Sequence, residues 1–180
     1  MEFFSRQKKN PKWVSWVASL AILLITLPLL YNTVMDSLTL AGDDTRTMTN
    51  HWVTENLSPN SKILMEIYTP IFPKETFIFY YVGQNGDLVR FDPNESYKNI
   101  FKAPGHIGDL VDIGQIKSEG INYMILGSMY NRYLTEHDKF QKEVMTYQDL
   151  FSQAKIVFKA SPLRGAIAGP EVIVYSFSNN

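Results

Sequence analysis

The sequence predicts an α/β fold with a mixed β-sheet, preceded by one N-terminal transmembrane helix. First, 23 consecutive residues without a charged side chain, positions 13–35, separate Lys12 from Asp36. Second, short apolar runs of strand length then alternate with segments of helical periodicity, which is typical of a sheet covered by helices. The 145 residues from position 36 to 180 are enough for one domain of ordinary size.

The uncharged run is long enough to cross a bilayer, because about 20 residues at about 1.5 Å each span roughly 30 Å of hydrocarbon. Trp13 and Trp16 at one end and Tyr31 near the other suit the two membrane interfaces. Four basic residues precede the run and acidic residues follow it. The positive-inside rule therefore predicts a cytoplasmic basic tail at 1–12 and an extracytoplasmic domain in a single-pass protein of the cell membrane.

Two alternatives to a retained transmembrane helix stay open. A cleaved signal peptide would have a shorter apolar core and a small-residue cleavage site, and the nearest small residue, Ala41, has a poor context. A buried core helix of a soluble protein would rarely be apolar on every face. We therefore expect the lipid bilayer as the first partner of this chain.

Beyond the span, residues 36–43 are expected to form a linker. Asp44 or Thr45 can cap a helix that extends to about Asn56. The run at 63–68 is expected to be a strand. A second strand at 77–82 and a third at 88–91 flank Asn85-Gly86, which is a strong hairpin signal.

The second half of the domain is expected to contain two helical segments and three strands. Asp109 can cap a short helix that Gly120 closes, and a longer helical stretch at 129–154 has a break near Thr135. The largely apolar strand at 121–126 is typical of a central strand reached by a parallel crossover. The terminal strands, 156–160 and 172–177, are expected to be antiparallel, and residues 93–108 are loop-like.

Composition and charge exclude several classes of protein. Apolar residues make up 45% of the chain and charged residues 19%, as in a folded domain. A formal net charge of -1 argues against a generally basic nucleic-acid-binding protein, so we expect no nucleic-acid partner. The chain has no cysteine, which excludes disulfide bonds, thiolate zinc sites and cysteine nucleophiles.

Acidic and hydroxyl side chains give only weak signals for chemistry. Asp43 and Asp44 could hold a metal ion or act as a base, or be a linker acid and a helix cap. His106, Asp109 and Asp112, at spacings of three, could also hold a metal ion, whereas a cap and a solvent-exposed face would explain the two acids more simply. Ser128 in LGSMY lacks the glycines of a nucleophile elbow, and no phosphate-binding glycine motif is present. We therefore predict no catalytic residue, no metal and no cofactor.

Aromatic and arginine side chains near the end of strand 121–126 are the better candidates for ligand binding. Ligands of α/β sheets favour the carboxyl ends of strands, and such side chains can hold a sugar or a phosphate. Tyr133 belongs to the same group, although core-edge positions and a solvated arginine would explain the pattern equally. The loop at 162–170 could line a binding surface or simply connect two strands. The tentative substrate-binding residues are Tyr123, Tyr130, Arg132 and Arg164.

Four motifs, in this order, are similar to the C-terminal extracytoplasmic domain of multi-pass bacterial glycosyltransferases of the dolichyl-phosphate-mannose-protein mannosyltransferase-like family. These motifs are a D-T-R segment followed by tryptophan, a proline-to-isoleucine approach to a strand, a tyrosine-rich strand end and a G-P closing strand. Their residues are Asp44, Thr45, Arg46 and Trp52; Pro59, Ser61, Lys62 and Ile63; Tyr123, Ser128, Tyr130 and Arg132; and Gly169, Pro170 and Tyr175. The resemblance covers roughly residues 20–178.

The resemblance implies a function without placing catalysis on this chain. Enzymes of that family use polyprenyl-phosphate sugars, have many membrane spans, and carry the catalytic acid in their first extracytoplasmic loop. This chain has one predicted span, and Asp44 matches the terminal domain rather than that loop. The expected role is therefore to position substrate or acceptor, either as a fragment of a longer enzyme or beside a multi-pass partner. A single-pass envelope sensor or assembly partner without enzymatic activity is the alternative.

Overall fold

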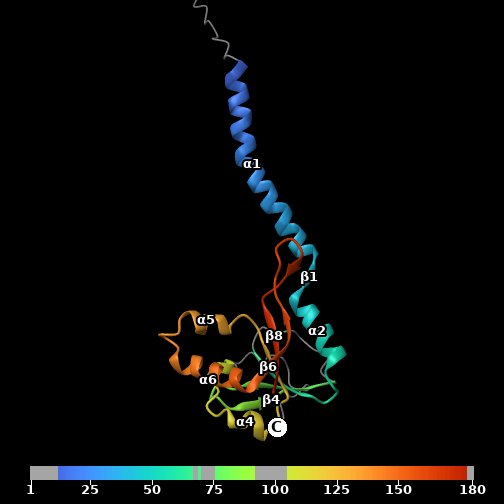
Figure 1. The fold of residues 1–180 in the computed structure, drawn as a ribbon, viewed down its shortest axis with the longest axis vertical. Helices are drawn as coiled ribbons and strands as arrows, with labels where there is room; N and C mark the ends of the chain where they lie inside the picture. Colours follow the sequence, from blue (N-terminus) through green and yellow to red (C-terminus); the bar gives the residue numbers. More distant parts are fainter. Residues whose placement is uncertain (1–11, 67–68, 70–75, 92–104, 178–180) are drawn as a thin grey trace, which may run out of the picture.

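In the computed structural model, which describes residues 12–66, 69, 76–91 and 105–177, one long helix leads into a mixed sheet with helices on both faces (Figure 1). The predicted mixed α/β class and the long apolar N-terminal helix are confirmed. The helix, α1, extends from Lys12 to Ala41 and projects away from the sheet. Among the described residues it is the one helix long and apolar enough to cross a membrane.

The expectation of a linker at 36–43 is wrong for residues 36–41, which continue α1. No glycine or proline interrupts this stretch before Gly42, so the sequence supplies nothing that would end the helix earlier. The hydroxyl side chains of its last turns also bond within the helix. Ser37 Oγ donates to Thr33 O at 2.8 Å, and Thr39 Oγ1 donates to Met35 O at 2.8 Å.

Six strands form the main sheet, in the spatial order β4-β3-β2-β5-β8-β6. β2 is parallel to both β3 and β5, whereas β3–β4, β5–β8 and β8–β6 are antiparallel. The predicted hairpin, the parallel crossover, the central position of strand 121–126 and the antiparallel terminal pair are therefore confirmed. The strands are β2 (Lys62–Met65), β3 (Ile78–Val82), β4 (Leu88–Arg90), β5 (Tyr123–Leu126), β6 (Ala154–Ala160) and β8 (Val172–Phe177).

Each face of this sheet carries its own hydrophobic core, because successive strand residues point to opposite faces. Ile63 and Ile125 pack on one face, against Val53 of α2 (Thr45–Asn56). Leu64 and Met124 pack on the other face. The elements there are η1 (Ile107–Asp109), α4 (Gly114–Ser118), α5 (Tyr130–Thr135) and α6 (Gln141–Gln153).

Most local expectations hold, with one correction. Asp44 caps α2 as predicted, and its side chain accepts a bond from Arg46 N at 2.7 Å. The break near Thr135 is confirmed, because α5 ends there and α6 begins at Gln141. Asp109 does not begin a helix: it closes η1, and its carboxylate accepts from His106 N at 2.7 Å. Residues 67–68, and 93–104 of the predicted loop, lie outside the described residues.

The connection between β6 and β8, which we call the β6–β8 loop (residues 161–171), fastens the sheet to the end of α1. Arg164 Nη2 donates to Asn32 Oδ1 at 2.8 Å and contacts Asp36 Oδ1 at 3.2 Å. Gly165 N–H donates to Thr39 Oγ1. Two short strands, β1 (Asp43–Asp44) and β7 (Ile167–Ala168), pair in parallel beside this contact. Figure 1 shows the loop reaching along the lower end of α1.

Candidate functional site

A buried carboxylate lies at the carboxyl ends of the central parallel strands. Glu66 directly follows β2, and its side chain is only 3% exposed. Its backbone N–H still bonds to Ile125 O of β5 at 3.0 Å, which fixes the direction of the side chain. Glu66 Oε2 accepts from Gly127 N at 3.1 Å, and Oε1 accepts from the Tyr147 hydroxyl at 2.6 Å. This is the edge of an α/β sheet where ligands usually bind.

Burial raises the pKa of Glu66 to about 7, although the bonds from Tyr147 and Gly127 act in the opposite direction. Desolvation disfavours the charged carboxylate, whereas hydrogen-bond donors favour it. Glu66 can therefore gain or lose a proton near neutral pH. In this conformation the side chain is buried away from solvent.

The phenol that meets Glu66 belongs to an aromatic cluster contributed by α5 and α6. The Tyr147 ring lies 6.3 Å from the Tyr130 ring and 5.9 Å from the Phe151 ring, between ring centroids. Phe151 in turn stacks on Tyr175 of β8 at 5.1 Å. Burial raises the pKa of Tyr147 and of Tyr130, so both phenols stay protonated as hydrogen-bond donors. The cluster thereby positions two hydroxyl groups beside carboxylates.

The second of these hydroxyls connects the buried cluster to the protein surface. Tyr130 Oη donates to Glu171 Oε1 at 3.1 Å, and Glu171 lies in the β6–β8 loop just before β8. Glu171 Oε2 also contacts Lys159 Nζ at 2.7 Å and accepts from Ser161 Oγ at 3.0 Å. The bond from Lys159 lowers the pKa of Glu171, so this carboxylate is charged.

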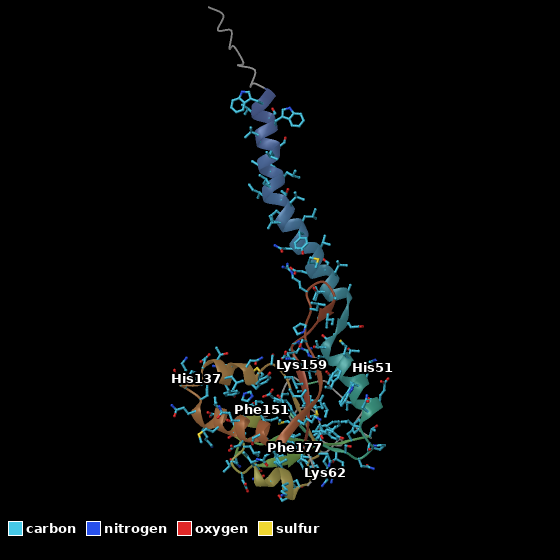
Figure 2. All side chains as sticks on the ribbon, viewed as in Figure 1. His51, Lys62, His137, Phe151, Lys159 and Phe177 are labelled. Atoms are coloured by element: carbon cyan, nitrogen blue, oxygen red, sulfur yellow. The ribbon has the colours of Figure 1, made fainter. Side chains whose placement is uncertain are left out.

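We call the side chains of Glu66, Tyr147, Tyr130, Glu171 and Lys159 the carboxyl-end cluster. Lys159 is its exposed end, since 47% of that side chain is accessible. Figure 2 places Lys159 nearer to α1 than Phe151 and Phe177. The cluster therefore runs from a sealed acid under α6 to an exposed ion pair on the side of the domain that faces α1.

The structure separates the four residues that the sequence singled out. Tyr130 alone joins the carboxyl-end cluster. Tyr123 begins β5 and packs in the core of the α2 face, so its expected place at the carboxyl end of the strand is wrong. Arg132 is exposed on α5. Its Nε lies 3.8 Å from Glu136 Oε1, and its Cζ lies 5.6 Å from the centroid of the Phe140 ring. Arg164 lies against α1. Their role in substrate binding stays a prediction.

The structure also shows where the acidic, hydroxyl and aromatic residues lie whose sequence pattern allowed more than one interpretation. Among the described residues, no group of three or more His, Cys, Asp or Glu side chains is suited to hold a metal ion. Asp112 precedes α4, and its carboxylate accepts from Gly114 N at 2.8 Å. Tyr133, which the sequence grouped with Tyr130, contacts the His106 ring edge-on at 5.6 Å, and burial raises the pKa of Tyr133 to about 12. Ser128 is exposed in the turn before α5.

Sequence reasoning missed Glu66, although the run ILMEIY contained a usable signal. An acidic side chain inside a strand that is otherwise apolar must either face solvent or find buried partners. Its partners, Gly127 and Tyr147, lie 61 and 81 residues away in the sequence. Only the sheet order brings them together, and a single sequence does not supply that order.

Comparisons with protein-family models, curated proteins and solved structures gave no match to this chain. The fold and the site together define a mixed α/β domain carried on one long apolar helix, with a tyrosine-carboxylate cluster at the carboxyl ends of its parallel strands.

Proposed function

We propose that this chain is a membrane-anchored, extracytoplasmic domain that assists a lipid-linked-sugar glycosyltransferase by positioning substrate or acceptor, without carrying the catalytic acid. One observation carries the proposal. The β6–β8 loop is hydrogen-bonded to α1 through Arg164, and the same loop supplies Glu171 to the carboxyl-end cluster. The cluster is therefore held close to the point where α1 leaves the lipid. The resemblance of the sequence to the terminal domain of such enzymes supplies the chemical class of the substrate.

The composition of α1 supports its place in a bilayer. Its side chains at positions 13–31 are all exposed in the isolated chain, so the protein itself does not cover them. Its threonine hydroxyl groups bond to carbonyl oxygens of the same helix, which suits a lipid environment. Thr26 Oγ1 donates to Ile22 O and Thr33 Oγ1 to Leu29 O, each at 2.9 Å. A helix with these properties is stable among acyl chains.

The strand register supports a site close to the membrane surface. Leu126, the last residue of β5, pairs with Ile173 near the start of β8, so the carboxyl end of β5 is level with the β6–β8 loop. The sugar phosphate of a polyprenyl-phosphate donor lies at the lipid surface. Arg132, Lys159 and the phenol of Tyr130 supply the charged and aromatic contacts that suit such a group.

Photocrosslinking with a polyprenyl-phosphate sugar that carries a diazirine tests this function. With the full chain in proteoliposomes, we expect saturable labelling of peptides from α5 or the β6–β8 loop, competed by unlabelled donor. Arg132→Gln should reduce labelling several-fold, whereas Arg90→Gln on the far edge strand β4 should leave it unchanged. Labelling that is not competed would contradict substrate positioning, and sugar transfer by this chain alone would contradict the absence of a catalytic acid.

A specific observation favours a second candidate function, a single-pass envelope sensor without enzymatic activity. Glu66 has a pKa of about 7 inside the core. Hydrogen bonds of Arg164 and Thr39 connect α1 to the α/β domain that follows it, which we call the head (residues 43–177). A change of protonation could therefore reach the helix through packed elements. Co-purification with a multi-pass partner at a pH-dependent yield, without donor crosslinking, would favour this function.

A further inference from the structure

We infer that the β6–β8 loop is a second membrane contact, in which Leu163 reaches the boundary between acyl chains and head groups and Arg164 binds a phospholipid phosphate. This inference rests on the membrane placement of α1 in the proposed function. It adds that the head lies against the bilayer in one orientation instead of moving freely at the end of its anchor.

The depth of the loop follows from its contacts with α1. Asn32 and Asp36, the partners of Arg164, flank the end of the uncharged run at residue 35. That run is about 34 Å long at about 1.5 Å per residue, and the hydrocarbon layer is roughly 30 Å thick. Asp36 therefore lies in the head-group layer, and the loop beside it lies at the same depth.

Leu163 is an apolar side chain that the protein leaves uncovered at this depth. It is 59% exposed, although its backbone is held firmly in the loop. Leu163 N donates to Ile167 O at 3.0 Å, and Ile167 N donates to Leu163 O at 2.8 Å. An exposed leucine beside an apolar helix gains free energy when lipid covers it, by the same burial that stabilises a protein core.

Arg164 retains donors for a lipid phosphate. Both of its contacts within the described residues use Nη2, whereas a guanidinium group has five N–H donors. Arginine binds phosphate through two parallel hydrogen bonds. Because Asp36 offsets its charge, we expect contact with zwitterionic as well as anionic lipids. The occupant of this surface is therefore an ordinary phospholipid.

The absence of cysteine allows this inference to be tested by single-cysteine labelling of the full chain in phosphatidylcholine vesicles. Three variants, Leu163→Cys, Leu24→Cys in the middle of the span and Val111→Cys, carry an environment-sensitive fluorophore. Val111 is 66% exposed and lies three residues before α4, the helix at the end of the domain opposite α1 (Figure 1). We expect phosphatidylcholine with a doxyl group at carbon 5 to quench the label at 163 at least two-fold more than the label at 111.

The label at position 24 separates the possible failures. We expect it to be quenched more strongly by a doxyl group at carbon 12 than at carbon 5, in the reverse order to position 163. Quenching at 24 with none at 163 would overturn the lipid contact of the loop and leave the anchor intact. No quenching at 24 would overturn the membrane span, and with it both the proposed function and this inference.

Discussion

At the scale of single residues, Glu66 is the most informative side chain in the molecule. Most buried acids in proteins are paired with a cation, whereas the Glu66 carboxyl accepts only from a phenol and a backbone amide among the described groups. Burial favours the neutral form of this carboxyl more in the folded protein than in water, which is why its pKa is raised. Its proton therefore contributes to the stability of the fold.

We predict that the stability of the protein falls as pH rises through neutrality, and that Glu66→Gln removes this dependence. The pKa of Glu66 in the folded state is raised from 4.5 to about 7, so the stabilising contribution is complete below 4.5 and is lost as pH rises to about 7. The full loss is about 3 kcal/mol, at about 1.4 kcal/mol per pH unit. Urea unfolding of the full chain in detergent micelles, from pH 4 to 8, measures it.

Exposed Glu55 on α2 provides the matched control, because Glu55→Gln changes the same functional group without burial. The control should retain the slope of the wild-type protein. A Glu66→Gln variant with the same pH dependence as the wild-type protein would show that the carboxyl titrates normally, and the explanation based on burial would be wrong.

At the scale of secondary-structure elements, the β6–β8 loop joins three parts of the molecule. Arg164 and Gly165 contact α1, Pro170 O accepts from Thr45 Oγ1 of α2 at 2.6 Å, and Glu171 belongs to the carboxyl-end cluster. A loop of 11 residues thereby fixes the helix, the sheet and the site relative to one another. Its backbone conformation is correspondingly restricted.

We predict that Thr39→Val loosens the contact between α1 and the loop. The substitution removes the oxygen that accepts from Gly165 N–H, and an unpaired donor at a partly buried site costs about 1 kcal/mol. Hydrogen exchange of residues 161–169 should accelerate several-fold, with little change in the strands. Thr33→Val is the control, because the Thr33 hydroxyl bonds only to Leu29 O of its own helix. Equal exchange in both variants would contradict a role for the Thr39 contact.

We predict that alanine is tolerated at Gly120 and not at Gly169. Both glycines have positive φ angles, 66° and 97° respectively. A Cβ atom at Gly120 would meet only Lys62 Nζ at 3.9 Å, so the cost is backbone strain of about 1 kcal/mol. At Gly169 it would lie 3.0 Å from Asp44 Oδ2 and closer still to Thr45 Oγ1, and we expect a loss of about 2 kcal/mol or more.

Thermal unfolding of the two alanine variants in the same detergent ranks these costs directly. The Gly169→Ala variant should unfold at the lower temperature. Equal melting temperatures would mean that the β6–β8 loop can move away from the start of α2 without a penalty, in contrast to the close approach described above.

At the scale of the whole molecule, the sequence allowed the fold class and most elements to be predicted because their signals are local. Asn85-Gly86 specified a hairpin, and an uncharged run specified a long helix. The junction was harder to predict: residues 36–41 continue α1, and β1 pairs with β7 across more than 120 residues. The sheet order, and with it the partners of Glu66, depends on contacts between distant segments that one sequence does not reveal.

We predict that the head and the N-terminal tail lie on opposite sides of the membrane. The cysteine of a Lys117→Cys variant, in α4, should react with a membrane-impermeant maleimide when the cell membrane is intact. Any barrier outside the cell membrane would first be made permeable to the reagent. A single cysteine at Ser5 should react only after lysis. Labelling of position 117 only after lysis would place the head in the cytosol and would contradict the orientation that the basic tail predicts.

Retention of the protein in membranes at alkaline pH tests the anchor itself. The wild-type chain should stay in the pellet after carbonate extraction, whereas Leu23→Lys combined with Leu24→Lys should shift it to the supernatant, since each lysine at mid-bilayer costs about 3 kcal/mol. Release of the wild-type protein would favour a cleaved leader or a soluble helix instead.

The unbroken course of α1 into the head has a mechanical consequence. Thirty residues at about 1.5 Å each make a helix about 45 Å long. The contacts of the β6–β8 loop restrain the outer end of this helix relative to the domain. Transmembrane helices adjust to bilayer thickness by tilting, on average by about 20°. If α1 spans a bilayer as proposed, a thinner membrane would increase its tilt and rotate the α/β domain with it, so membrane thickness would change the angle at which the exposed Lys159–Glu171 pair meets its surroundings.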